Sequence, residues 1–259
     1  MKNLAWKSIY YGKKSLLWIV YLLFAIYICY LVTSSQALGA KIIFGSLGCI
    51  VLSIVILFEY LKNLYEKMIY ALTVDCDLKK AVALKQKLQK KDLFNGFKQS
   101  IIIFDSLFLL DEGSYATCLE HLHKNQHFFH STLDYLFIYY HTQMYCYSFL
   151  KDEENLESCL EKLFKLKNAK KKQMNNLFSW NEITGMRYFH QNRNKKCLSE
   201  LDLIDKNRLN NRELTYVLYL KGHCLLKLNE TSEGYRLLKE AKALGNTLAV
   251  AQLNERGGI

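Results

Sequence analysis

Residues 15–33 read SLLWIVYLLFAIYICYLVT and residues 42–58 read IIFGSLGCIVLSIVILF, and neither run contains a charged residue. A helix needs about 17–25 predominantly apolar residues to cross the hydrocarbon core of a bilayer. Both runs reach that length, and neither has the polar face that a helix of a soluble core normally carries. We therefore predict a transmembrane helical hairpin rather than a buried core hairpin.

The basic residues around the two runs predict the orientation of this hairpin. Four lysines precede the first run and two follow the second, whereas the loop between the runs contains only Lys41. Cytoplasmic flanks are enriched in Lys and Arg, so both termini are expected in the cytoplasm of a multi-pass protein of the cell membrane. Signal-peptide cleavage at Ser35-Gln36-Ala37 is an alternative, and it would leave the bulk of the chain on the same side.

We divide the chain into a membrane anchor, 1–69, and a cytoplasmic domain, 70–259. Charge and cysteine content limit the classes of function that these two parts can have. The net charge of +11 is spread as +5 over the anchor and +6 over the domain. The only dense basic cluster, 167–172, is interpreted as a solvated turn, so no nucleic-acid partner is expected. Eight scattered cysteines without a CxxC pair indicate reduced, mostly buried thiols.

Proline is absent from all 259 residues, although a usual frequency of about 5% would give roughly a dozen. Together with many Leu, Lys, Glu and Ala residues, this predicts an all-α chain. The richness in Lys, Asn and Ile is typical of a bacterial protein. The predicted helices after the hairpin span 75–90, 97–110, 113–124, 131–149, 152–167, 174–190, 194–205, 211–228 and 231–244.

A short pattern recurs on every second helix of this series. It reads CLEHL from Cys118, CLEKL from Cys159 and CLSEL from Cys197, and a fourth copy, LLKEA from Leu237, keeps the apolar positions. The copies begin 41, 38 and 40 residues apart. A fixed period with two helices per unit is the mark of an α-solenoid, because each helix pair buries its apolar face only by stacking on the next pair. We expect about four such pairs.

The last unit, 211–245, resembles a tetratricopeptide repeat (TPR). Gly222, Gly234 and Ala241 fall at the small positions of that family, and Leu238 falls at a large apolar one. Asn246 stands where the family usually has proline, and the unit interval exceeds 34 residues, so the array resembles a degenerate TPR solenoid.

The resemblance implies that the first helix of each pair lines a concave groove that grips a protein or peptide. Repeat offsets assign nine side chains to this groove: His141, Tyr145, Asn176, Ser179, Arg187, Tyr216, Tyr219, His223 and Lys227. Aromatic, amide and basic groups suit an extended or acidic peptide. Alternatively, individual members of this set interlock between helices instead of facing a partner.

Candidate chemistry is sparse in this sequence. The run His121–His130 contains histidines at metal-ligand spacing, but a turn predicted near Asn125 would break that spacing. The paired acids Asp75/Asp77, Asp111/Glu112 and 152–154 are assigned to helix starts, where caps and the helix dipole favour them. No nucleotide, nucleophile-elbow or zinc-protease motif occurs. We expect no cofactor, no metal and no enzymatic activity, although an unfamiliar catalytic site remains an alternative.

The leading functional hypothesis is a membrane-anchored adaptor that binds a protein or peptide in its groove. A membrane-bound peptide sensor or a bacteriocin-type immunity protein is the alternative. The partner, the pathway and the oligomeric state do not follow from the sequence.

Overall fold

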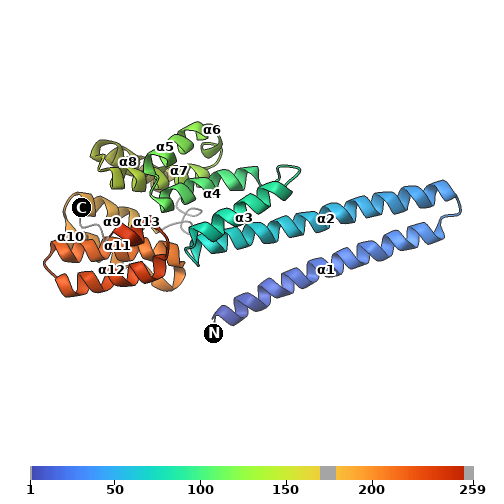
Figure 1. Ribbon diagram of the computed structural model, residues 1–259, viewed down its shortest axis with the longest axis horizontal. Coiled ribbons are helices and arrows are strands. Elements are labelled where there is room, and N and C mark those ends of the chain that lie inside the picture. Colours follow the sequence, from blue (N-terminus) through green and yellow to red (C-terminus); the bar gives the residue numbers. More distant parts are fainter. Residues whose placement is uncertain (1, 170–178, 254–259) are drawn as a thin grey trace. The chain divides into compact units, whose positions relative to one another are not determined.

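The computed structural model describes residues 2–169 and 179–253, with side chains described for 18–167 and 179–253 (Figure 1). All regular elements in these ranges are helical, which confirms the all-α class. They are α1 Lys2–Ser34, α2 Leu38–Thr73, α3 Leu78–Lys91, α4 Lys98–Glu112, α5 Tyr115–Lys124, α6 Gln126–Phe129, α7 Leu133–Leu150, α8 Glu153–Ala169, α9 Trp180–His190, α10 Asn194–Asp202, the 3-10 turn η1 Lys206–Arg208, α11 Asn211–Lys227, α12 Thr231–Gly245 and α13 Ala249–Gln252.

The chain divides into two compact units, Met1–Asn63 and Leu64–Ile259. Helix α2 begins in the first unit and continues to Thr73 in the second, and it is long and apolar enough to cross a membrane, by length and composition. Only 6% of its most apolar window is buried, which disfavours a buried core helix. The part of α1 whose side chains are described, Trp18–Ser34, is a shorter apolar stretch. A second span and the orientation of the hairpin remain predictions.

Two contacts join α1 and α2 within the first unit. A Cβ atom added to Gly48 would lie 2.5 Å from Cγ2 of Ile28, so glycine is the residue that fits between the helices there. Nearer the other end, the Tyr21 hydroxyl donates to Glu59 Oε1 at 3.4 Å. Small residues allow apolar helices to approach closely in this way.

In the second unit, helices that follow one another in sequence pack as antiparallel neighbours. The pairs are α4 with α5, α7 with α8, α9 with α10, and α11 with α12. Successive pairs contact each other through α5 and α7, α8 and α9, and α10 and α11. The recurring pattern lies on the second helix of each pair, and its first and fifth positions are buried in all four copies: Cys118, Leu122, Cys159, Leu163, Cys197, Leu201, Leu237 and Ala241.

Glycines set the close approach of the last pair. A Cβ atom at Gly222 of α11 would lie 2.6 Å from the Leu238 side chain and 3.1 Å from the Gly234 carbonyl oxygen. A Cβ atom at Gly234 would meet Leu226 at 2.9 Å. The small residues that the repeat pattern placed at these two positions therefore occupy a real helix–helix contact.

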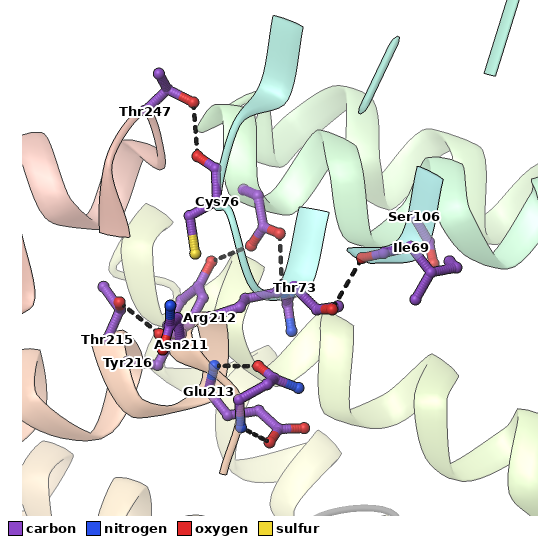
Figure 2. Close-up of polar contacts among 12 residues, drawn as sticks. Ile69, Thr73, Cys76, Ser106, Asn211, Arg212, Glu213, Thr215, Tyr216 and Thr247 are labelled. Carbon is purple, nitrogen blue, oxygen red and sulfur yellow. Dashed lines mark hydrogen bonds and ion pairs between the residues drawn. The ribbon is translucent and has the colours of Figure 1, made fainter. Parts of the chain in front are cut away.

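The end of the second unit contacts its beginning. The Thr247 hydroxyl donates to the Cys76 carbonyl at 2.9 Å and accepts from the backbone N–H of Leu78, as Figure 2 shows in part. The Asn211 side chain donates to the Val74 carbonyl at 2.7 Å, and α13 packs against α4. The C-terminal segment of the second unit therefore packs against the segment 74–78 and against α4 of the first helix pair.

Local sequence explains several helix ends. Asp77 caps α3 by accepting from the Lys80 backbone N–H at 2.9 Å, as predicted for an acidic residue at a helix start. Asn210 and Glu213 form a reciprocal capping box at the start of α11 (Figure 2). The assignment of Asp111 and Glu112 to a helix start is wrong, because both lie in the last turn of α4 and Gly113, with φ of 86°, terminates that helix.

Candidate functional site

The predicted groove residues fall mainly on the first helices of the pairs. His141 and Tyr145 lie on α7, Arg187 lies on α9, and Ser179 precedes α9 directly. Tyr216, Tyr219, His223 and Lys227 lie along α11. Asn176 lies outside the described residues.

A buried polar cluster connects α7 with α9. The Tyr145 hydroxyl donates to Oε1 of Glu182, and Nε2 of His141 lies 3.5 Å from the same oxygen. Burial acts to raise the pKa of Glu182, but the hydrogen bonds from His141 and Tyr145, together with the charges of His141 and Arg212, outweigh it and lower that pKa below its ordinary value. Glu182 is therefore held as a carboxylate inside the second unit.

A second buried cluster connects α4 with α11. Nε of Arg212 donates to Oδ2 of Asp111 at 2.5 Å, and the Tyr216 hydroxyl donates to Oδ1 at 2.8 Å. Burial raises the pKa of the Asp111 carboxyl, while the charge and hydrogen bond of Arg212 oppose that rise. Burial acts to lower the pKa of Arg212, but the charges of Asp111 and Tyr216 and the hydrogen bond to Asp111 outweigh it and raise that pKa. The two groups form a buried ion pair.

Two tyrosines join these clusters. The rings of Tyr145 and Tyr216 meet edge to face with their centroids 4.7 Å apart. One continuous set of buried polar and aromatic side chains therefore links the first helices of all four pairs, α4, α7, α9 and α11.

Burial in these clusters leaves several of the predicted groove residues with little surface exposed to solvent. His141, Tyr145, Tyr216 and Tyr219 are only 4%, 2%, 3% and 2% exposed. These four side chains are buried between helices, which agrees with the alternative that they interlock there instead of facing a partner. Their contact with a partner stays a prediction.

Arg187 lies apart from the buried clusters. Its guanidinium pairs with Glu157 of α8 and stands 5.5 Å from the centre of the Phe164 ring. Of the predicted groove residues on α11, Tyr219 and Lys227 line the cavity described next, whereas Tyr216 and His223 do not. Arg187 and Ser179 do not line it either.

A cavity of about 220 Å³ opens between α7, α9 and α11. Its floor is buried and largely apolar, with Tyr145, Met186, Phe189, Tyr219 and Leu220. Its rim is exposed and polar, with Lys151, Glu153, Asn192 and Lys227. Three residues of the predicted groove, Tyr145, Tyr219 and Lys227, thus come together at one cavity.

Polar contacts fix the walls of this cavity. Ser148 Oγ lies 2.8 Å from Nε2 of His190, which ties α7 to α9. Burial and the nearby Lys227 lower the pKa of His190, so its imidazole is neutral at pH 7. Lys227 Nζ lies 4.5 Å from the centre of the Phe189 ring and donates to Asn192 Oδ1 at 3.2 Å.

Sequence reasoning missed Asp111, Glu182, Arg212, Ser148 and His190. A buried Arg and two buried carboxylates carry no local signature, and each partner lies far away in the chain: Asp111 and Arg212 are 101 residues apart, and Tyr145 and Glu182 are 37 apart. The one local signal is the spacing of Arg212 and Tyr216. They are four residues apart on the same helix, so they lie on the same helix face.

The histidine run is divided by the fold. Helix α5 ends at Lys124 and Asn125 precedes α6, so the predicted turn near Asn125 is confirmed. His121 turns toward the Ile102 carbonyl, with its Nε2 at 3.0 Å from that oxygen. Over the described residues, no three His, Cys, Asp or Glu side chains are grouped to hold a metal ion.

The cysteines give a direct test of this packing. All six in the second unit are buried, and burial raises the pKa of Cys76 to about 12 and that of Cys159 to about 11. Because the thiolate is the reactive form, N-ethylmaleimide at pH 8 is expected to modify at most Cys29 and Cys49 in the native full chain, and all eight cysteines after denaturation. Intact mass measures the adducts, and rapid modification of Cys76 or Cys159 in the native chain would contradict the packing.

No protein-family model, characterised protein or solved structure matches this chain.

Proposed function

We propose that the chain is a membrane-anchored, non-enzymatic adaptor whose second unit binds a peptide segment of a partner protein. The observation that carries the proposal is the cavity between α7, α9 and α11, which combines an aromatic floor with a polar rim that carries two lysines and one glutamate. The resemblance of 211–245 to a tetratricopeptide repeat supports a peptide ligand for this face.

The size of the cavity determines what enters it. Ligand sites for whole small molecules are usually about 300–1,000 Å³. A cavity of about 220 Å³ accommodates one large side chain of a peptide, while the rest of the peptide lies across the rim. The buried rings of Tyr145, Phe189 and Tyr219 favour an apolar or aromatic side chain in that position.

The two lysines of the rim favour a peptide that carries a negative charge. None of the ion pairs between described residues involves Lys151 or Lys227. Both follow or end a helix, where a cation balances the partial negative charge of the carbonyl groups. Lys227 donates to a neutral amide, Asn192, and stands over the Phe189 ring, so a peptide carboxylate would be a stronger partner for it.

Membrane anchoring completes the proposal. Helix α2 meets the requirements of a span, and α1 adds the second span of the proposed hairpin, with both termini in the cytoplasm. Anchoring raises the effective concentration of the second unit at the membrane surface, so micromolar affinity for each peptide suffices for recruitment.

A peptide library presented to the full chain in detergent tests the proposal. Half of the peptides carry a free C-terminal carboxylate and half are amidated. Retained peptides are expected to place Leu or Phe next to a carboxylate, and Lys227→Glu is expected to weaken their binding by about tenfold to a hundredfold, as loss of a charge-assisted hydrogen bond would.

Lys239→Glu provides the matched control, because Lys239 is an exposed lysine of α12 that does not line the cavity. Affinity should be unchanged in this variant. Equal losses in the two variants would indicate only diffuse attraction to a basic chain, and failure to retain any peptide at millimolar concentration would remove the proposed function.

A further inference from the structure

We propose that a second cavity, formed by α5, α6, α7 and α8, is a binding site for a phosphomonoester group. The cavity has a volume of about 250 Å³ and lies on different helices from the rim of the peptide cavity, except for α7 and the start of α8. The inference is independent of the proposed function.

The lining of this cavity consists almost entirely of hydrogen-bonding side chains. Three tyrosines, two histidines, three amides, Ser158 and Lys162 contribute to it, and none of the described residues that line it is Asp or Glu. Hydroxyl, amide, imidazole and ammonium groups all donate hydrogen bonds. A cavity with many donors and no carboxylate selects an anion with several acceptor oxygens.

Lys162 supplies the permanent charge. Its Nζ stands 5.3 Å from the centre of the Tyr140 ring, which holds the ammonium group at the cavity. None of the ion pairs between described residues involves Lys162. A phosphate oxygen would give this cation a charged partner.

The histidine run that stood out in the sequence contributes two members to this cavity. His121 and His123 lie on the same helix, α5, but have different neighbours: Nε2 of His121 lies near the Ile102 carbonyl, whereas His123 lines the cavity together with His130, which follows α6. The His130 ring packs edge to face on Tyr139 at 5.3 Å, which fixes its position. An imidazole presents an N–H donor in either protonation state.

Fixed groups form the inner wall. Gln143 and Cys159 are buried, and the Cys159 thiol donates to Gln143 Oε1 at 3.5 Å. This contact leaves the amide N–H groups of Gln143 to donate, and the Tyr139 hydroxyl, which also lines the cavity, is one of their partners. The carboxylate of Asp152 is occupied at the start of α8, where it accepts from the backbone and side chain of Asn155.

The volume limits the size of the ligand. A cavity of about 250 Å³ holds a phosphate group with a short carbon skeleton, whereas larger ligands usually need about 300 Å³ or more. Such a phosphomonoester can come from a soluble metabolite or from the headgroup of an acidic membrane lipid, and the chemistry at the cavity is the same.

Calorimetry on the full chain in a nonionic detergent tests this site, with glycerol phosphate as the soluble probe and glycerol and sulfate as comparisons. Nanodiscs of phosphatidylcholine, with and without phosphatidic acid, test the lipid source. Binding of glycerol phosphate identifies a soluble ligand, and binding only to discs with phosphatidic acid identifies a lipid headgroup. Either result supports the site if Lys162→Met weakens the binding by about tenfold or more.

Lys165→Met is the matched control, because it removes the same charge from an exposed position of α8 that does not line the cavity. His123→Ala, at another exposed position, should weaken binding without affecting the fold. The proposal is overturned if Lys162→Met and Lys165→Met act equally, if glycerol binds as well as glycerol phosphate, or if neither probe binds.

Discussion

Replacing Arg212 with leucine is expected to lower the free energy of unfolding of the second unit by about 3–5 kcal/mol. Arg212 and Asp111 form a buried ion pair, and the Asp111 side chain is completely inaccessible to solvent. Without the guanidinium, Asp111 must either remain charged without its cation or take up a proton inside the unit. Thermal melting of the full chain in detergent, followed by circular dichroism, measures the loss.

Two further variants identify the cause of this loss. Arg236→Leu removes an arginine whose side chain is 59% exposed and paired with Glu233 and Glu240, so its effect should stay below about 1 kcal/mol. The double variant Asp111→Asn with Arg212→Met removes both charges and keeps an acceptor for the Tyr216 hydroxyl. It should be more stable than Arg212→Leu alone. If the double variant is the less stable of the two, an unpaired buried charge is not the cause.

Replacing Gly222 with valine is expected to destabilise the second unit by about 3 kcal/mol through overpacking. A Cβ atom added at this position would lie 2.6 Å from Leu238 and 3.1 Å from the Gly234 carbonyl oxygen, and valine carries two further methyl groups on that atom. The same contact sets the distance between α11 and α12. The variant should therefore also weaken peptide binding, because Tyr219 and Lys227 reach the cavity from α11.

A double variant separates this clash from the general cost of valine in a helix. Leu238→Ala removes the atoms that the new side chain would meet, so Gly222→Val combined with Leu238→Ala should lose less stability than the sum of the single variants. Lys239→Val, at an exposed position of α12, measures the propensity cost alone, which is below about 1 kcal/mol. Strict additivity of the two single effects would contradict the proposed contact.

Long helices were predicted from the sequence more accurately than short ones. Predicted helices such as 211–228 and 231–244 agree with α11 and α12 to within one residue at each end. These boundaries could be predicted because caps and apolar periodicity act over a few residues. The short helices α6 and α13 were not predicted, since a single helical turn has no period of its own. Of the predicted helix 174–190, residues 174–178 lie outside the described residues, and α9 begins at Trp180 with Ser179 as its N-cap.

The candidate site was predictable only in part. Repeat offsets led to Tyr145, Tyr219 and Lys227, which do line one cavity. They also led to Arg187, which pairs with Glu157 on α8. Offsets specify which face of a helix a side chain occupies, but the neighbour that it meets depends on how the pairs are packed.

The acidic residues show where local reasoning ends. Asp77 was predicted to lie at a helix start and caps α3, because capping involves only the next three residues. Asp111 was assigned the same role, yet it lies in the last turn of α4 and forms an ion pair with Arg212. Nothing within a few residues of Asp111 distinguishes these two roles.

By itself the sequence determined the all-α class, the apolar run long enough to cross a membrane and the buried stripes of the repeated helix pairs. These features depend on composition and on periodicity within single helices. The tertiary structure alone decided that α13 returns to α4, that Asp111 and Arg212 meet, and that His123, His130 and Lys162 share a cavity. Each of these contacts joins separate helices, and it forms only when the apolar faces of several pairs have been buried together.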